Sequence, residues 1–588
     1  MTVPAASPSG IEALAPYAPR SWVPPDADLR QGPTIIGLYE ALMDRPLASR
    51  DDIETLLRDW SELQAALDQV RALLYIRMTC HTDNPDHASR YTRFVEDVLP
   101  AVKPLADIVG RRYLAAQTEF PAPDDQLEVF DRAIAVDVAL FDPRNVRLQT
   151  EDELLAQDYQ AIHAAMTIEF QGRERTLQEM NKLLFEQNRE LREAAWRAAT
   201  VRRMEDRERI EDIFDDMMSV RSRIAANAGC ANFIEYQFRA LHRFDYSAAD
   251  CLAFHESVER HVVPVLGELL LQRRDEMGID TLRPWDTGVD TSGRPPLRPF
   301  DTGSELIERG SDAFRSLDAD LGERFANLCA EGLLDVVSRK GKAPGGYQET
   351  LAELRKPFIF MNAVGLDDDV RTLLHEAGHA FHALAAAHHS LYAYRGAPIE
   401  FCEVASFGME FLAGEHLGPF YDDAAQARSR HDFFRDKLTM LTWVAVIDAF
   451  QHWLYTHPGH NREERAAAWL NVHQRFNGGV VDWSGLEEEQ SCLWQRQLHL
   501  FEVPLYYIEY GIAQLGALQL WQQARVDPKL ALANYNRALA LGGSRPLPEL
   551  FEAAGLRFDF SGDILAPLVQ EVRGELERCR AAQFGYGD

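Results

Sequence analysis

The segment His375-Glu376-Ala377-Gly378-His379 is an HExxH motif in a stretch whose apolar periodicity predicts a helix. Residues four apart on an α-helix lie on one face, so the two imidazoles can bind a single metal ion. Catalytic zinc accepts such nitrogen ligands and keeps one coordination position open for water. Glu376 follows the first histidine and is placed to act as a general base toward that water. The spacing therefore predicts metal-assisted hydrolysis, most often of peptide bonds.

The same motif also arises by chance on solvated helix surfaces, so its surroundings must decide between the two interpretations. Residues 373–384 are largely apolar, and histidines buried among them would be costly unless paired or bound to an ion. Gly378 costs roughly 1 kcal/mol inside a helix, and such a glycine often marks the close approach of another element. Asp367-Asp368-Asp369 supplies acceptors for the start of this helix. These features favour the metal site.

A catalytic zinc needs a third protein ligand, and the candidates lie on a second predicted helix that begins near Pro398. Glu400, Glu403 and Glu410 are three and seven positions apart and share one face of this helix. Three acids on one face usually form a solvated stripe, but the other faces of this helix are apolar. The carboxylates are therefore expected to point inward, and spacing alone does not choose between Glu400 and Glu403.

Residues 345–347, 356–362 and 369–382 together resemble the oligoendopeptidase F and thimet oligopeptidase family of zinc peptidases. In that family the third ligand is a glutamate in a Glu-x-x-Ser context about two dozen residues after the second histidine. Glu403 to Ser406 matches this pattern. The resemblance, which covers most of the chain from about residue 150 onward, therefore implies one zinc ion per chain held by His375, His379 and Glu403.

The resemblance also implies roles for residues around the metal. Residues that support the metal ligands are implied at Glu410, His382 and Asp369. Residues that bind the substrate are implied at Gly345, Gly346, Tyr347, Phe360 and Tyr507. Residues that bind the scissile carbonyl are implied at His499, Tyr506 and Tyr510. The C-terminal segment departs from the alternating tyrosines of the family, because Ile508 interrupts the pattern. Tyr507 is out of phase with it, so Tyr506 and Tyr510 are preferred as carbonyl-binding residues.

The expected fold is mainly α-helical, with helical periodicity in segments such as 151–166 and 177–204. Strand patterns are few, at residues 166–176 and at Phe358–Asn362 just before the metal-binding helix. The second is either an edge strand that pairs with an extended substrate or a simple buried strand. The resemblance implies two helical halves that flank a deep substrate channel, with a small β-sheet beside the active-site helix. We divide the chain into an N-terminal helical region covering the channel, 1–205, and a catalytic peptidase domain, 206–588.

Composition restricts the partners and the compartment. The 588 residues include 92 acidic and 61 basic ones, a net charge of −31 that repels phosphate backbones and argues against nucleic acid. Seven cysteines form no CxxC pair, which is typical of a reducing cytosol. The first 25 residues do not resemble a signal peptide, and the longest apolar run, 438–447, is too short to span a bilayer. The protein is expected to be cytoplasmic, without membrane contact, and either a monomer or a homodimer.

The function predicted from these features is a zinc metalloendopeptidase that cleaves internal bonds of short, unstructured oligopeptides. One alternative is a dipeptidyl carboxypeptidase of the same family, which needs a cationic or hydrogen-bonding anchor for the terminal carboxylate. The other is an inactive peptide-binding scaffold. That alternative predicts loss of the base or of a ligand, whereas His375, Glu376, His379 and Glu403 are all present.

Overall fold

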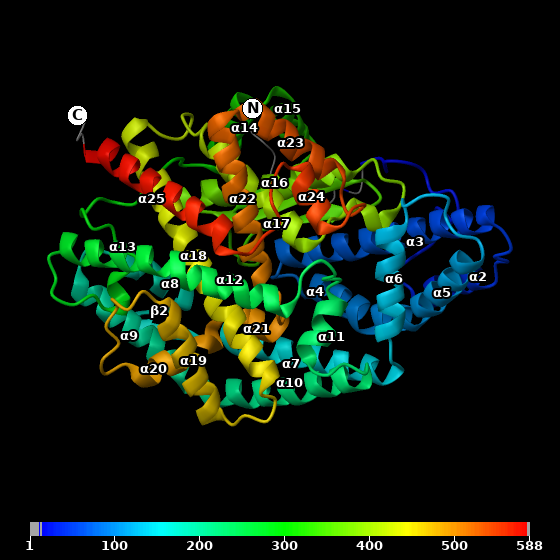
Figure 1. The fold of residues 1–588 in the computed structure, drawn as a ribbon, viewed down its shortest axis with the longest axis horizontal. Coiled ribbons are helices and arrows are strands. Elements are labelled where there is room, and N and C mark those ends of the chain that lie inside the picture. Colours follow the sequence, from blue (N-terminus) through cyan, green and yellow to red (C-terminus); the bar gives the residue numbers. More distant parts are fainter. Residues whose placement is uncertain (1–10, 12–13, 585–588) are drawn as a thin grey trace.

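The computed structural model describes residue 11 and residues 14–584, and it confirms a mostly helical protein with small sheets. The N-terminal helices pack around their own hydrophobic core, built from side chains between Val23 and Phe130 together with Tyr394. They extend to the right in Figure 1. The helices are α2 (Gly32–Met43), α3 (Arg50–Cys80), α4 (Pro85–Arg93), α5 (Leu99–Glu119) and α6 (Glu128–Leu140), with a π-helical turn at Phe94–Val98 between α4 and α5.

The middle of the chain adds a hairpin and further helices. These elements are α7 (Pro143–Ala164), β1 (Thr167–Phe170), β2 (Arg173–Thr176), α8 (Leu177–Lys182), α9 (Arg189–Glu205), α10 (Arg207–Asn227), α11 (Phe233–Ala240), α12 (Ala248–His261), α13 (Val263–Glu276), α14 (Gly303–Leu317) and α15 (Ala319–Ala330). The helix expected at 177–204 is interrupted between α8 and α9. Asn188 explains the break, because its side chain accepts a hydrogen bond from the Leu191 amide and so starts a new helix.

A three-stranded sheet lies beside the helix that carries the HExxH motif. Its strands are β3 (Leu334–Val337), β4 (Tyr347–Leu351) and β5 (Lys356–Ala363), in the order β3-β5-β4. β5 runs parallel to β3 and antiparallel to β4, with Tyr347 opposite Phe360. The edge-strand interpretation of Phe358–Asn362 is therefore wrong, and the buried-strand alternative is correct. Ladder partners on both sides of β5 occupy its backbone groups, and β4 forms the edge instead.

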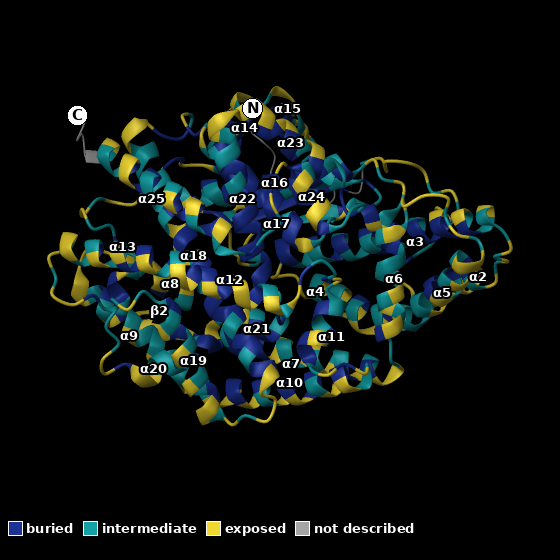
Figure 2. Ribbon diagram, viewed as in Figure 1, coloured by how far each residue is buried: buried dark blue, intermediate teal, exposed yellow. Residues whose placement is uncertain are grey.

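The HExxH helix and two partners form the centre of the molecule. They are α16 (Asp367–Ala386), α17 (Ile399–Gly414) and α22 (Ile508–Val526), and α17 packs against both of the others. Figure 2 shows this central group as mostly buried. A Cβ added to Gly378 would lie 2.6 Å from Ser406 Cα and 2.7 Å from Ala405 O. The close approach expected from Gly378 is thus the contact between α16 and α17.

The remaining elements complete a second, larger hydrophobic core that includes residues from 140 to 576 together with Ile11 and with Ala72, Ile76 and Cys80 of α3. They are α18 (Asp423–Thr456), α19 (Arg462–Phe476), α20 (Glu487–Ser491), α21 (Leu498–Glu502), α23 (Pro528–Ala540), α24 (Leu547–Ala553) and α25 (Gly562–Phe584), with 3-10 turns at Leu183–Phe185, Pro284–Asp286, Tyr392–Arg395 and Leu493–Arg496. The larger core crosses residue 205, since α7 and α10 pack together on either side of it. The division into 1–205 and 206–588 stays a prediction. No helix in the described part of the chain is both long and apolar enough to cross a membrane.

Candidate active site

The two histidines of the motif lie side by side on α16 and face the same carboxylate. Their ring centroids are 4.9 Å apart, with the ring planes nearly perpendicular. Glu403 on α17 places Oε2 3.5 Å from His375 Nε2 and 3.8 Å from His379 Nε2. The helical spacing on α16 and the close packing at Gly378 together produce this convergence of three donor atoms.

Glu400 and Glu403, which spacing left unresolved, point to different neighbours. Glu400 accepts a hydrogen bond from the Tyr246 hydroxyl at 2.7 Å and lies 3.5 Å from Arg243 Nε. Glu403 instead accepts a hydrogen bond from the Ser406 hydroxyl at 3.1 Å and faces the histidines. The packing of α17 therefore brings Glu403, and not Glu400, to the histidine pair.

Glu410 holds the first histidine in place from behind. Its Oε1 lies 2.8 Å from His375 Nδ1, and its Oε2 accepts a hydrogen bond from Lys437 Nζ at 2.7 Å. Burial alone would raise the pKa of Glu410, but the charge of Lys437 and the bond to His375 lower it to about 2. The carboxylate stays charged, so His375 directs Nε2 toward Glu403.

Glu376 lies on the same helix with a free carboxylate oxygen. Its side chain is buried, and Oε2 has no hydrogen-bond partner among the described residues. Burial raises the pKa of Glu376 to about 7, and the charges of Glu403 and Glu410 add to this rise. The charge of His375 acts in the opposite direction. A buried carboxyl that titrates near neutrality and has an unused oxygen has the properties of a general base.

The glycines before β4 lie close to Glu376. A Cβ at Gly346 would be 3.6 Å from Glu376 Oε1 and 3.1 Å from the Thr372 methyl group. Gly345, with φ +93°, adopts the left-handed conformation that favours glycine. A side chain at either position would be strained or would crowd the carboxylate, which explains the two small residues.

Tyr347 and Phe360 form a stacked pair across β4 and β5, with ring centroids 4.6 Å apart. The Tyr347 hydroxyl hydrogen-bonds to the Thr79 hydroxyl on α3 at 2.6 Å. Phe360 is fully buried, so the expectation that its side chain binds substrate is not supported. Its position on the central strand places the ring in the core.

Two residues expected to support the metal ligands occupy different surroundings. Asp369 Oδ2 accepts hydrogen bonds from the amides of Val364 and Leu366, both at 2.8 Å, and so stabilises the start of α16. His382 is buried against Phe401, and its Nε2 has no partner in the described part of the chain. Burial lowers the pKa of His382 to about 4, which keeps it neutral.

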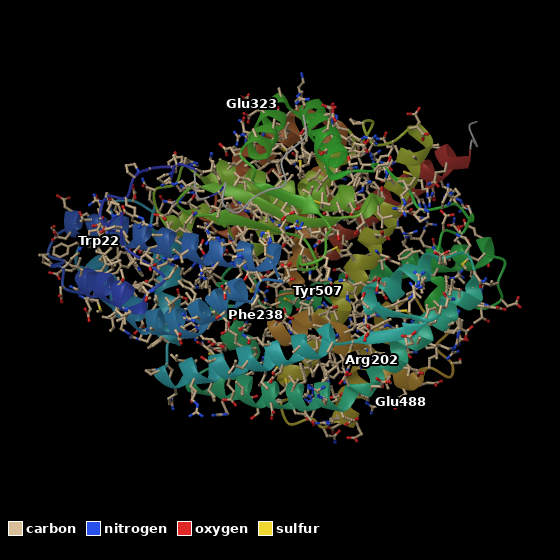
Figure 3. The ribbon with its side chains drawn as sticks, turned by 180° about the vertical axis from the view of Figure 1, so that it is seen from behind. Trp22, Arg202, Phe238, Glu323, Glu488 and Tyr507 are labelled. Carbon is tan, nitrogen blue, oxygen red and sulfur yellow. The ribbon has the colours of Figure 1, made fainter. Side chains whose placement is uncertain are left out.

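His499 and three tyrosines form a cluster opposite α17. The ring centroid of His499 is 4.7 Å from Tyr507, 5.9 Å from Tyr510 and 6.2 Å from Tyr506. The Tyr506 hydroxyl lies 3.5 Å from Glu403 Oε1, which connects the cluster to the group of His375, His379 and Glu403. Tyr507 is near the middle of the molecule in the view from behind in Figure 3.

A short chain of hydrogen bonds determines which nitrogen of His499 carries the proton. Trp443 Nε1 donates to Gln497 Oε1 at 3.0 Å, which orients the amide, and Gln497 Nε2 then lies 2.7 Å from His499 Nδ1. The amide nitrogen can only donate, so Nδ1 accepts and the proton resides on Nε2. Burial lowers the pKa of His499 to about 4, so the ring is a neutral donor at pH 7.

The donor set meets the requirements of a zinc ion. Imidazole and carboxylate atoms within 4.8 Å of one another are the combination that zinc prefers in catalytic sites. The neighbouring acids also attract a cation. Burial alone would lower the pKa of His375. Its hydrogen bond to Glu410 and the charges of Glu410, Glu403 and Glu376 instead raise this pKa to about 9.

Several residues that hold this site together were not predicted from the sequence. Lys437 lies between the Phe407 and Phe433 rings, and its being the single lysine of α18 was the available signal. Gln497 and Gln451 had no such signal. The Gln451 side chain accepts a hydrogen bond from the Leu505 amide at 2.5 Å, next to Tyr506. Leu505 has φ +62°, a conformation that is rare for leucine and that this contact supports.

Comparison with known proteins agrees with the geometry. Oligopeptidase PepF of Bacillus subtilis (strain 168) is 27% identical over 340 residues, which cover 54% of this chain and 49% of that protein. The oligoendopeptidase F homolog of Borreliella burgdorferi is 21% identical over 85% of this chain and 86% of its own length. The structure of PZ peptidase A with an inhibitor superposes with a TM-score of 0.85 at 26% identity, covering 97% of this chain and 99% of that one.

The alignment with PepF spans about half the length of that protein, whereas the structural match extends over nearly the whole chain. The family comparison matches residues 183–569, which include α16, α17 and the tyrosine cluster. That range contains every residue of the convergent histidine and glutamate site. The chain is a member of peptidase family M3.

Proposed function

We propose that this protein is a zinc metallopeptidase that hydrolyses internal bonds of short oligopeptides. The observation that carries the proposal is the convergence of His375, His379 and Glu403 beside Glu376, whose carboxylate has an unused oxygen. The names of the relatives, an oligopeptidase and an oligoendopeptidase F homolog, agree with this substrate class. Seven unpaired cysteines support a cytoplasmic location.

His375, His379 and Glu403 would hold the ion, with Glu410 orienting His375. When bound, zinc supplies Lewis acidity that polarises a carbonyl and acidifies water. Glu376 accepts the proton of the attacking water and passes it to the leaving amine. His499 Nε2 and the hydroxyl of Tyr506 or Tyr510 donate hydrogen bonds to the oxyanion.

Replacing Glu376 with Gln tests the base. The amide keeps the size of the side chain but accepts no proton, so kcat should fall by at least about 10³-fold while metal content is unchanged. Glu323→Gln, on the exposed surface of α15, is the control and should leave both unchanged. Cleavage of a quenched fluorescent peptide by Glu376→Gln at the wild-type rate would refute the assignment.

We infer that a deep channel between the two helical halves restricts the substrates. His375 and His379 keep 22% and 17% of their side-chain surface accessible, although buried residues surround them. An extended peptide reaches such a site and a folded domain does not. Incubation with one native protein and with its tryptic fragments should give cleavage of the fragments alone. Digestion of the native protein at a comparable rate would contradict the channel.

One observation favours a second candidate, the removal of dipeptides from a free C-terminus. Arg496 is exposed, lies over Trp443 at 5.4 Å from its ring centroid, and forms no ion pair with any described acid. Its guanidinium remains cationic at pH 7. It lies near Tyr507, a member of the tyrosine cluster beside the metal ligands. An unpaired guanidinium there suits a substrate carboxylate.

Peptides with free and amidated C-termini distinguish the two candidates. If Arg496 anchors the terminal carboxylate, Arg496→Gln should raise KM for the free acid about tenfold and leave the amide unaffected. Arg557→Gln, on the surface, is the matched control. Equal cleavage of both peptides at internal bonds, with no effect of Arg496→Gln, would leave the endopeptidase as the function.

A further inference from the structure

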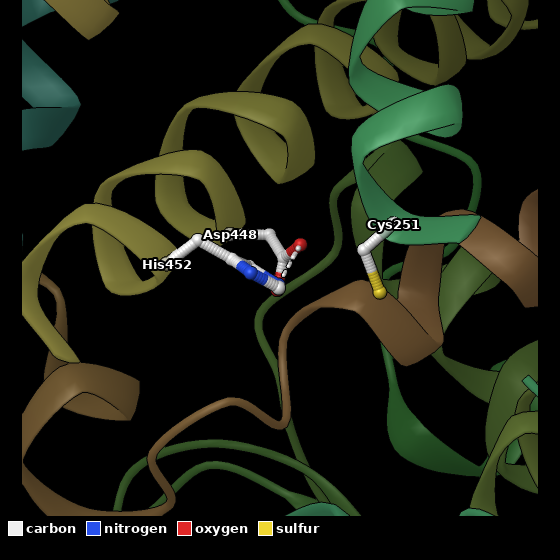
Figure 4. A group of neighbouring side chains, drawn as sticks. All are labelled: Cys251, Asp448 and His452. Atoms are coloured by element: carbon white, nitrogen blue, oxygen red, sulfur yellow. Dashed lines mark ion pairs between the residues drawn. The ribbon is translucent and has the colours of Figure 1, made fainter. Parts of the chain in front are cut away.

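A second group of metal-binding side chains lies between α12 and α18, apart from the residues assigned above. Cys251 and His255 are four positions apart on α12, and Asp448 and His452 are four positions apart on α18. Each pair therefore shares one helix face, and the two helices pack against each other. All four side chains are buried, with no more than 6% of any residue exposed. Figure 4 shows Cys251, Asp448 and His452 facing the same space.

Three of these residues bring their donor atoms together. One atom from each of Cys251, Asp448 and His452 lies within 4.8 Å of the other two. His452 Nε2 is 3.4 Å from Asp448 Oδ2. Two ligands of a tetrahedral zinc ion, each about 2.1 Å from the metal, are about 3.4 Å apart. The imidazole and the carboxylate are therefore already at the separation that an ion between them requires.

The hydrogen bonding of the group is incomplete without a further partner. Asp448 Oδ1 and His452 Nε2 have no hydrogen-bond partner among the described residues, although both side chains are buried. Leaving such atoms unpaired costs free energy. Asp448 Oδ2 does have a partner, since His255 Nε2 lies 2.8 Å away. The imidazole of His255 thus holds the carboxylate from the side, as residues around metal ligands commonly do.

We propose that Cys251, Asp448 and His452 bind a second divalent cation of the zinc class, with His255 orienting Asp448. Thiolate, imidazole and carboxylate are each established zinc ligands, and sulfur selects against magnesium and calcium. The side chains are buried, so the proposed role of the ion is structural and not catalytic. It ties α12 to α18, the helix whose Lys437 contacts Glu410 behind His375.

Cobalt substitution tests the site without relying on catalysis. The full-length protein is produced in medium in which Co²⁺ replaces Zn²⁺, and its near-ultraviolet absorption and metal content are measured. The His375, His379 and Glu403 site contains no sulfur, so a thiolate-to-cobalt charge-transfer band reports only the second site. We expect that band in the wild-type protein and in His379→Ala, together with a second equivalent of metal in the wild type.

Cys251→Ser should abolish the band and remove one equivalent of metal. Cys402→Ser is the matched control, because Cys402 lies next to Glu403 but its thiol is directed to the Ala397 carbonyl. It should retain the band. A wild-type protein with a single equivalent of metal and no thiolate band would overturn the proposal and leave Asp448 and His452 as a buried side-chain contact. That measurement needs no variant, so poor folding of Cys251→Ser does not obscure the result.

Discussion

Glu376 differs from Glu410 because no described residue forms an ion pair with its carboxylate. Glu410 has Lys437 and His375 as partners, whereas Glu376 Oε2 has none among the described residues. The same burial therefore has opposite results, a pKa of about 2 for Glu410 and about 7 for Glu376. The charged carboxylate of Glu410 is suited to orienting His375, and the carboxyl group of Glu376 is suited to exchanging a proton.

The pH dependence of kcat/KM should reflect this difference. A base must be deprotonated, so activity should fall as the pH is lowered through the pKa of Glu376, about 7 without metal. A bound cation stabilises the carboxylate and moves this acid limb to lower pH. The profile is measured with a neutral peptide. A constant kcat/KM from about pH 8 down to about pH 5 would contradict Glu376 as the base.

The proton on His499 Nε2 depends on the amide of Gln497. In Gln497→Glu the carboxylate accepts a hydrogen bond from Nδ1, so the neutral ring has no proton on Nε2. We expect kcat to fall on the order of 10²-fold with little change in KM, because the lost bond is made to the oxyanion. Gln497→Leu, which removes the bond without reversing it, should have a smaller effect. Wild-type kcat in Gln497→Glu would exclude the proposed donor.

At the scale of elements, the contact between α16 and α17 sets the distance from the histidines to Glu403. Gly378 permits that contact because the backbone of α17 occupies the space where a Cβ would project. Backbone atoms cannot rotate away as a flexible side chain can. Any side chain at this position must therefore move one helix relative to the other.

Gly378→Ala should destabilise the protein by about 1–3 kcal/mol and weaken metal binding, since Glu403 moves away from the histidines. Urea unfolding and a metal titration against a chelator measure the two effects. Gly37→Ala in α2 is the control, because no atom outside the neighbouring turns of α2 lies within 4 Å of the new Cβ. It should be neutral or stabilising by up to about 1 kcal/mol. Unchanged metal affinity in Gly378→Ala would show that the contact does not position Glu403.

At the scale of the whole molecule, two buried aspartates form ion pairs, one with a distant segment and the other within its own segment. Asp286 binds Arg189 and Arg192 at 2.8 Å each, and Asp335 binds Arg339 at 2.6 Å and Lys342 at 2.8 Å. Burial alone would raise the pKa values of both aspartates. The hydrogen bonds from their partners nevertheless hold them below the ordinary range.

Stability should therefore decrease in acid. A carboxyl whose pKa is lower in the folded than in the unfolded state stabilises the fold above the unfolded value of about 4. That contribution is lost as the pH falls through the folded value. The urea midpoint should thus be constant near neutrality and drop below about pH 4. Asp335→Asn should lower the midpoint at pH 7 and flatten the drop. A midpoint independent of pH would contradict these ion pairs.

The sequence alone determined the features that depend on local spacing. The HExxH pair, the α16 and α17 helices and the mostly helical class follow from periodicity and capping, which act within a few residues. A family resemblance chose Glu403, and the spacing on α17 did not. The break between α8 and α9 was visible in principle at Asn188 but was outweighed by the helical pattern on both sides.

Only the tertiary structure decided which residues distant in the chain meet. It placed β5 at the centre of its sheet, turned Glu400 toward Arg243, and brought Cys251 to Asp448 and His452. It also set the proton position of His499 through Trp443 and Gln497. The physical reason is that packing of whole helix faces fixes these contacts, and one segment carries no record of which face it will meet.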